Sequence, residues 1–138
     1  MNASEKRRET FLRQAFNITP FEWSKIWLHQ GGVCFVCGSK PIKQLATDHS
    51  HDTGLLRGLL CSRCNALLGK IENNFKRFGL HKIPGMTVIK ALRAFIAYLE
   101  SPPATEALGR QIYGYPGKMG TIAYRKWVKK GRNYRNTQ

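Results

Sequence analysis

The chain has few acidic residues and no long hydrophobic run. Its 138 residues include 8 Asp and Glu against 23 Lys and Arg, so the formal net charge is 23 − 8 = +15. No apolar run reaches the roughly 18 residues of a membrane-spanning helix. The charged residues 1–13 are not followed by an apolar stretch, so no secretory signal peptide is expected. These absences predict a cytoplasmic protein, in the host cell if a phage encodes it, with reduced cysteines.

Positive charge is what the chain has in excess, and such an excess favours a polyanionic partner, most often nucleic acid. A basic surface that only keeps the protein soluble is the alternative. The length fits one domain with an attached tail. A hydrophobic content of 42% argues against wholesale disorder.

The hydrophobic pattern predicts an α+β protein that is mostly α-helical. Thr19, Pro20 and Glu22 form a capping-box pattern that opens a helix, and Gly31-Gly32 ends it. Helices are expected over residues 4–16, 20–30, 61–71 and 87–100, short strands over 45–49 and 55–60, and a loop over 75–86. The expected divisions are a charged N-terminal helix (1–18), a central domain (19–100) and a basic, aromatic-rich extension (101–138).

The four cysteines form two C-x2-C pairs, Cys34/Cys37 and Cys61/Cys64, with 23 residues between the pairs. Two such pairs bring four thiolates to one tetrahedral ion and predict one zinc ion per chain. Four thiolates leave zinc no open position, so the ion would be structural. Two disulfides or a redox C-x-x-C are the alternatives, and neither suits a reducing compartment.

Both aspartates of the chain, Asp48 and Asp52, flank two of its four histidines, His49 and His51. We expect Asp48 and Asn65 to hold a catalytic Mg²⁺ or Mn²⁺ through oxygen atoms. His49 is the candidate general base, because histidine ordinarily titrates near neutral pH.

His51 and Arg57 are candidates to hold a phosphate of the substrate. The alternatives are mixed Cys/His zinc ligation, solvated histidines without a role, and an Asn65 that only favours a helix start.

Residues 48–65 read D-H-S-H-D-T-G-L-L-R-G-L-L-C-S-R-C-N, and this stretch resembles the phage recombination endonuclease VII family of HNH, ββα-metal or His-Me finger nucleases. The resemblance covers about residues 18 to 100. The resemblance implies a zinc-stapled ββα-metal core with flanking helices, in which the four cysteines bind structural zinc. It also implies that Asp48 and Asn65 bind the catalytic Mg²⁺ or Mn²⁺, that His49 is the general base, and that His51 assists at the phosphate. Leu68 stands where the best-studied member carries a glutamate.

The segment after Glu106 has no acidic residue and interleaves basic residues with tyrosines and a tryptophan. It is expected to contact DNA, because basic side chains neutralise phosphates and aromatic rings stack on bases. The alternative is a solvated tail whose aromatics pack on the domain. Candidate DNA-contacting residues are Arg57, Lys126, Lys129, Lys130 and Arg132.

The apolar stripe of the helix over residues 88–99 fits either the core or a dimer face, and a resolvase that cuts two strands is expected to be a homodimer. The leading hypothesis is a metal-dependent endodeoxyribonuclease that hydrolyses branched DNA such as Holliday junctions. Its competitors are a phage HNH duplex-nicking or genome-packaging nuclease, and a zinc-containing DNA-binding module without catalysis.

Overall fold

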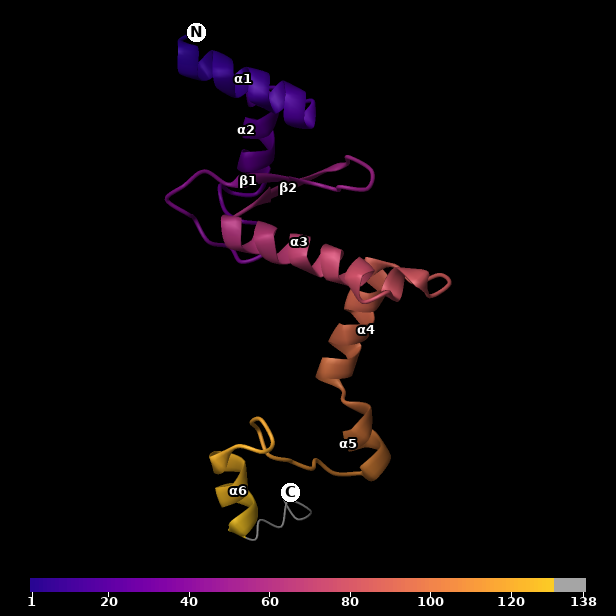
Figure 1. The fold of residues 1–138 in the computed structure, drawn as a ribbon. Coiled ribbons are helices and arrows are strands. Elements are labelled where there is room, and N and C mark those ends of the chain that lie inside the picture. Colours follow the sequence, from indigo (N-terminus) through magenta and orange to yellow (C-terminus); the bar gives the residue numbers. More distant parts are fainter. Residues whose placement is uncertain (131–138) are drawn as a thin grey trace. The chain divides into compact units, whose positions relative to one another are not determined.

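The computed structural model describes residues 1–130, which fall into two compact units, Met1–Leu80 and a second unit that begins at His81. The first unit contains the helices α1 (Ala3–Phe16) and α2 (Pro20–His29), the strands β1 (Ala46–His49) and β2 (Leu56–Leu60), and α3 (Ser62–Arg77), followed by a 3₁₀ turn at Leu80–Lys82 (Figure 1). The mostly helical α+β class and the strand–loop–strand–helix order are confirmed.

Both N-terminal helices begin at capping boxes, in which the cap side chain and a glutamate three residues later bond each other's backbone N–H. Asn2 pairs with Glu5 at α1, and Thr19 pairs with Glu22 at α2 with Pro20 in the first helical position. These reciprocal bonds satisfy backbone donors that a helix start leaves free. The start of the second helix is therefore where the sequence predicts it.

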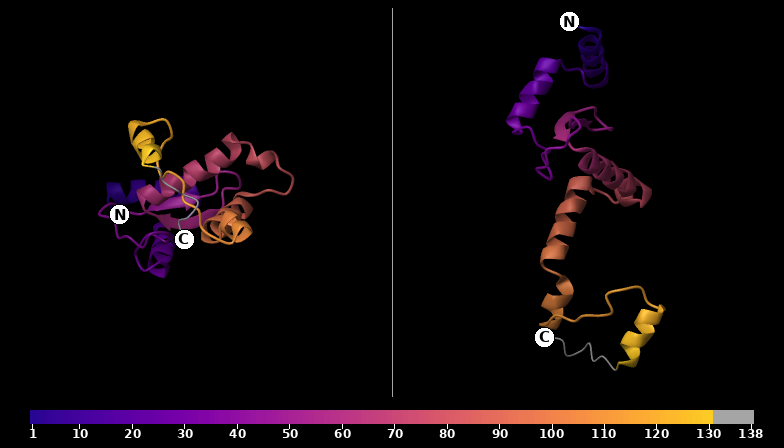
Figure 2. Two further views of the ribbon diagram at one scale, coloured as in Figure 1. Left: turned by 90° about the horizontal axis from the view of Figure 1, so that it is seen from below. Right: turned by 90° about the vertical axis from the view of Figure 1, so that its left-hand side faces the viewer.

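The strands form a two-stranded antiparallel hairpin, and α3 contacts both of them and lies beside them in Figures 1 and 2. The core of this unit consists of the buried side chains of Leu12, Trp23, Cys34, Leu45, Leu59, Leu60 and Cys61. Leu12 and Trp23 come from α1 and α2. The two N-terminal helices therefore complete the core on which the hairpin rests.

The predicted loop over residues 75–86 is wrong at its start, because α3 continues to Arg77. Leu68, Ile71 and Phe75 recur at helical spacing and are half-buried, so the apolar face of α3 extends past the predicted end. Gly79 then takes a positive φ of 78°, a conformation that glycine adopts without the steric cost that a Cβ imposes on other residues.

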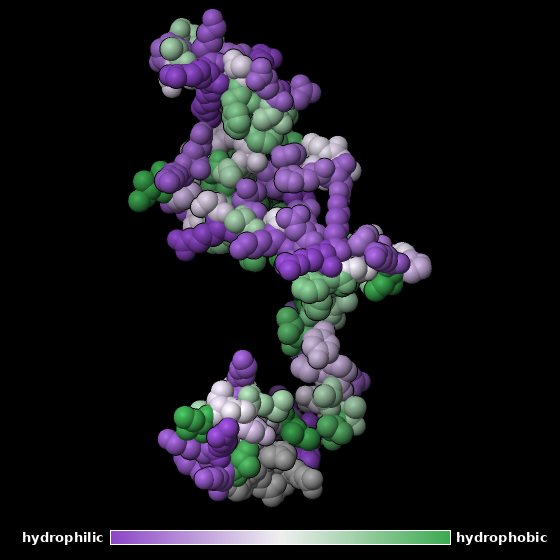
Figure 3. All heavy atoms as spheres, viewed as in Figure 1, coloured by the Kyte–Doolittle hydropathy of each residue, from purple (hydrophilic) through white to green (hydrophobic). Residues whose placement is uncertain are grey.

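The second unit contains α4 (Val88–Glu100), α5 (Pro103–Leu108) and α6 (Ile122–Lys129). Thr87 caps α4 as expected. The apolar stripe of α4 is core only in part: Val88 and Leu92 are half-buried, whereas Phe95, Ile96 and Leu99 are 56, 54 and 73% exposed. Apolar side chains show along α4 in Figure 3. None of the helices described in residues 1–130 is long and apolar enough to cross a membrane.

Within residues 101–130, where the sequence analysis named no elements, α5 and α6 are helical. The aromatic rings of Tyr115, Tyr124 and Trp127 pack on one another, with ring centroids 5.4 to 6.3 Å apart. These contacts lie within the segment itself, and the alternative in which the aromatics pack on the central domain stays a prediction. These three rings are half-buried, so their faces are partly occupied by protein contacts.

Candidate active site

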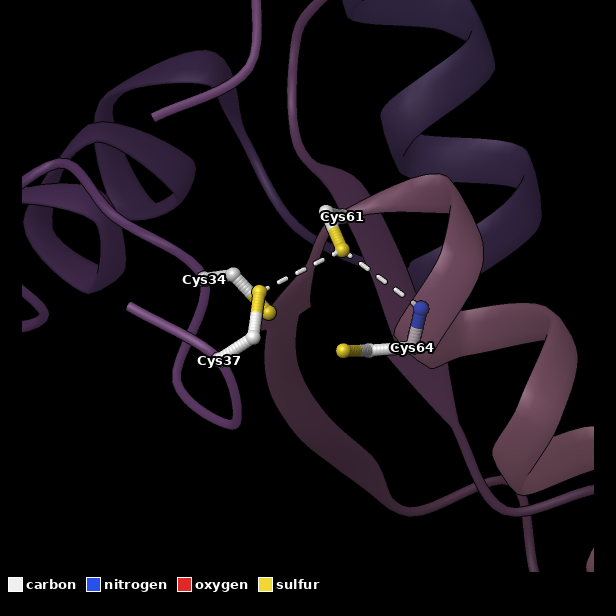
Figure 4. Close-up of side chains that lie close together, drawn as sticks. All are labelled: Cys34, Cys37, Cys61 and Cys64. Carbon is white, nitrogen blue, oxygen red and sulfur yellow. Dashed lines mark hydrogen bonds between the residues drawn. The ribbon is translucent and has the colours of Figure 1, made fainter. Parts of the chain in front are cut away.

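The four cysteine sulfur atoms converge on one point between the loop that follows α2 and the start of α3 (Figure 4). All four thiols are free, and their sulfurs lie within 4.8 Å of one another. The Sγ atoms of Cys37 and Cys61 are 3.7 Å apart. A tetrahedral zinc ion with bonds of about 2.3 Å requires sulfurs about 3.8 Å apart. The donor set and its spacing therefore fit one metal ion.

Hydrogen bonds to the backbone position the cysteines of this cluster. Cys34 donates its N–H to the carbonyl of Ser39, and its own carbonyl accepts from Gly38, each at 2.9 Å. Cys61 is the N-cap of α3, where its sulfur accepts the N–H of Cys64 at 3.4 Å. A tight turn thus presents one pair, and a helix start presents the other.

The thiols of the cluster differ in acidity. Hydrogen bonding from the Ser39 side chain and backbone lowers the pKa of Cys37 to about 6. The side-chain hydrogen bond with Cys61, followed by burial, raises the pKa of Cys64 to about 12. Because zinc binds thiolates, an ion at this cluster would displace the protons that the thiols still carry.

Asp48 lies near the end of β1, at an irregularity of the hairpin. Asp48 is opposite Gly58 and His49 is opposite Leu56, so Arg57 is the extra residue of a β-bulge. The Asp48 residue is only 8% exposed, and it is the one buried charged residue among those described. A buried carboxylate needs charged or hydrogen-bonding partners, and the bulge supplies one.

Arg57 is that partner, and it binds a second carboxylate as well. Its Nε and Nη2 donate to the two oxygens of Asp48 at 2.7 and 3.0 Å. Its Nη1 and Nη2 donate to the two oxygens of Glu72, on α3, at 3.0 and 2.9 Å. These bonds, with those to Glu72 first, raise the pKa of the guanidinium, which therefore stays charged. Arg57 is occupied by carboxylates in this structure.

His49 follows Asp48 and is half-buried. Its ring meets Phe16 of α1 edge-on, with centroids 5.4 Å apart, and lies 4.9 Å from the ring of His51. Its carbonyl accepts from Arg57 Nη2 at 3.3 Å. No hydrogen bond to a ring nitrogen of His49 occurs among residues 1–130, so both nitrogens can serve a water or a substrate.

Asn65 stands in the first turn of α3, next to Cys64. Its N–H donates to the Cys61 carbonyl at 2.9 Å, and its half-buried side chain makes no hydrogen bond within the part of the chain described. The amide oxygen is thus free to bind a cation. A zinc-filled cysteine cluster would fix this turn, and α3 packs on β1, the strand that carries Asp48.

The remaining DNA-contact candidates lie elsewhere in the chain. Lys126, Lys129 and Lys130 are exposed at or just after α6 in the second unit. Arg132 lies outside the described residues. Arg57 belongs to the hairpin of the first unit, so the predicted set divides between the two units.

Three contributors to the site were missed in the sequence: Phe16, Gln30 and Glu72. Glu72 left a signal, because it is the one acidic residue of α3 and follows Asn65 by two helical turns. Gln30, which the sequence places at the end of a helix, hydrogen-bonds the backbone of Leu59 on β2. Nothing in the sequence pattern except its apolar character indicated that Phe16 contacts the site.

Comparison of the sequence with known proteins shows the family of this chain. The family model described as recombination endonuclease VII matches residues 9–101. The Gene 59 proteins of Mycobacterium phages D29 and L5 are each 35% identical over 107 and 108 residues, covering 75% of this chain. The chain spans only 56 and 57% of those two relatives. On the extent of the family match, the chain belongs to the recombination endonuclease VII family.

Proposed function

We propose that this protein is a metal-dependent DNA endonuclease that hydrolyses phosphodiester bonds in branched DNA, as an HNH-type enzyme of phage recombination. The observation that carries the proposal is the pairing of a buried carboxylate, Asp48, with the adjacent His49, whose ring nitrogens make no described hydrogen bond. Membership of the endonuclease family supports the same conclusion.

The protein groups divide the chemistry among them. Asp48 and Asn65 supply the oxygen ligands for Mg²⁺ or Mn²⁺, ions that need few protein ligands beside water and phosphate. When bound, the ion would offset negative charge on the phosphate and the leaving oxygen. His49 takes the proton of the attacking water, and the exposed His51 assists at the phosphate.

The cysteine cluster is proposed as a structural zinc site. Its four thiolates would fill the coordination sphere of zinc, so this ion would not activate water. Its role would be to hold the first turn of α3, and hence Asn65, against the Cys34–Cys37 turn.

The positive charge of the chain is proposed to bind the phosphates of the DNA substrate. Within the second unit, the exposed lysines Lys126, Lys129 and Lys130 are the proposed contacts. We also propose Arg132 as a DNA contact. Such contacts bind phosphates without reading sequence. Arg57 is not included among these DNA contacts, because its N–H donors are already bound to the carboxylates of Asp48 and Glu72.

The proposed oligomer is a homodimer. The apolar side chains Phe95, Ile96 and Leu99 of α4 are more than half exposed in the single chain, and a second copy would cover them. Two copies would also bring the two active sites that cutting opposite strands of a junction requires. Sedimentation analysis with Phe95→Glu as the interface variant tests this assignment.

The central test measures Mg²⁺- or Mn²⁺-dependent cleavage by wild type, Asp48→Asn and His49→Ala. Asp48→Asn and His49→Ala should each lose cleavage by at least 100-fold while zinc content and DNA binding persist. Asp52→Asn and His29→Ala are matched controls on exposed residues and should cleave normally. Wild-type activity in either active-site variant would refute its assigned role.

Substrate choice separates the competing functions. Preferential cleavage of a four-way junction over linear duplex supports a resolvase. Equal rates favour the HNH nicking or packaging nuclease. Binding without cleavage by any divalent ion would leave the zinc-containing DNA-binding module.

A further inference from the structure

Arg57 forms a bridge between two carboxylates that come from different elements. Asp48 lies on β1 and Glu72 on α3, and the guanidinium holds both in two-pronged contacts of 2.7 to 3.0 Å. A further bond from Nη2 reaches the His49 carbonyl at 3.3 Å. One side chain thereby joins the strand that carries Asp48 to the helix that carries Asn65.

These contacts fix the direction of the Asp48 carboxylate. Planar, paired Arg–carboxylate contacts define the relative orientation of both groups more closely than a single bond does. The Asp48 side chain is 10% exposed, so water contributes little to its orientation. Arg57 therefore determines which side of each oxygen remains open to another ligand.

Charge explains why a second carboxylate is needed. Asp48 and Arg57 alone would form a neutral pair with little attraction for a divalent cation. Glu72 adds a negative charge, so the group of Asp48, Arg57 and Glu72 carries a net charge of −1. At this partly buried position the added charge is screened less than on an open surface.

We propose that Arg57 and Glu72 are positioning residues: Arg57 orients Asp48 as a metal ligand, and Glu72 anchors Arg57 and balances its charge. The proposal rests on the proposed function, in which Asp48 binds the catalytic ion. Asn65, Leu68 and Glu72 share one face of α3 at three- and four-residue spacing. The Glu72 carboxylate on this face therefore acts on Asp48 through Arg57.

The opposite mechanism makes a different prediction. If Arg57 were a competitor that occupies Asp48 until metal displaces it, weakening the Arg57 contacts would strengthen metal binding. If Arg57 positions Asp48, the same change weakens metal binding. Arg57→Lys distinguishes them, because it keeps the positive charge and loses the planar paired contacts.

The experiment measures Mn²⁺ binding to the full-length, zinc-loaded protein from the electron paramagnetic resonance of free Mn²⁺. Glu72→Gln and Arg57→Lys should each raise the Mn²⁺ dissociation constant by roughly 10- to 100-fold, the usual effect of losing a partner of a metal ligand. Asp52→Asn is the matched control, because it removes another hairpin-to-α3 ion pair, with Lys76 at 2.6 Å, that does not touch Asp48. It should leave Mn²⁺ binding unchanged.

Cleavage rates give a second measurement. At saturating Mn²⁺, Glu72→Gln should regain a rate within about threefold of wild type, because the lost interaction acts on metal binding. The two substitutions should also be non-additive in Mn²⁺ affinity, since they act through one contact. Unchanged affinity in Glu72→Gln, tighter binding in Arg57→Lys, or additive effects would overturn the proposal.

Failure of the underlying function would look different. If Asp48→Asn binds Mn²⁺ as tightly as wild type, or if wild type binds none, Asp48 is not the metal ligand and the proposed function fails together with this inference. If Asp48→Asn abolishes binding and Glu72→Gln has no effect, the inference alone fails. Zinc content and circular dichroism identify a misfolded variant, and Glu72→Gln decides the matter if Arg57→Lys does not fold.

Discussion

The side chain of Gln30 bonds both backbone groups of Leu59. Its Nε2 donates to the Leu59 carbonyl at 2.8 Å, and its Oε1 accepts the Leu59 N–H at 2.9 Å. Nε2 also donates to the Val33 carbonyl at 3.0 Å. The amide thereby occupies the free edge of β2 and joins it to the segment that leads into the cysteine turn. Gly58 leaves room for it, because a Cβ there would lie 3.0 Å from Oε1.

Gln30→Leu should destabilise the zinc-loaded protein by about 1 to 3 kcal/mol, the cost of one buried hydrogen-bonding group left without a partner. The substitution removes the partner of the N–H of the fully buried Leu59, whereas the Leu59 carbonyl still accepts the Phe35 N–H at 3.4 Å. Urea unfolding followed by circular dichroism measures the change. His29→Ala, on the exposed neighbouring residue, is the control, and an equal stability of the two variants would contradict the role of Gln30.

Cys61→Ser should abolish zinc binding and unfold the first unit, because structural zinc contributes on the order of 10 kcal/mol to folding. Metal analysis and circular dichroism measure the two effects, with Ser62→Ala as control. A folded, zinc-free variant would show that the ion is dispensable.

Removal of zinc by a chelator should become faster as the pH falls. Thiols bind zinc as thiolates, so protons compete with the ion, and the competition favours protons at lower pH. Cys64, whose pKa is raised to about 12 in the metal-free cluster, is the thiol that most favours its proton. Zinc release to a coloured chelator, measured between pH 8 and 6 under the ionic conditions of the other assays, checks the direction. A release rate independent of pH would argue against thiolate ligation.

Phe16→Ala should slow cleavage by roughly tenfold, a fraction of the 10²- to 10⁴-fold that general-base catalysis contributes. The Phe16 ring packs against the His49 ring in a T-shaped contact, and without it the imidazole gains freedom to leave its position. Phe16→Tyr keeps the ring and should restore the rate. Phe21→Ala, which removes an exposed ring of α2, should have no effect. A normal rate in Phe16→Ala would remove Phe16 from the catalytic machinery.

The double variant Lys126→Ala/Lys129→Ala should bind DNA more weakly and with a smaller dependence on salt. Each phosphate contact contributes about 0.9 to the slope of log affinity against log salt, so two lost contacts lower it by about 1.8. Lys82→Ala/Arg93→Ala removes the same charge from other exposed residues of the second unit. Equal slopes in the two double variants would indicate that only net charge matters.

The sequence by itself determined the features that depend on spacing over a few residues. The capping box of Thr19 and Glu22, the two C-x2-C pairs and the order of hairpin and helix all follow from local geometry, and the motif at residues 48–65 carried the family resemblance. The structure confirmed the fold class, and the cysteines lie as one metal ion requires.

Only the tertiary structure decided what the side chains around Asp48 bind. Arg57 and Glu72 are 15 residues apart, and the sequence pattern does not reveal which acceptors an arginine will meet once a bulge directs it toward a helix. The same holds for Gln30, whose partner Leu59 is 29 residues away. The α4 stripe was also ambiguous, because helical periodicity specifies an apolar face but not what covers it. Such contacts depend on how separate elements pack, and packing is a property of the folded chain.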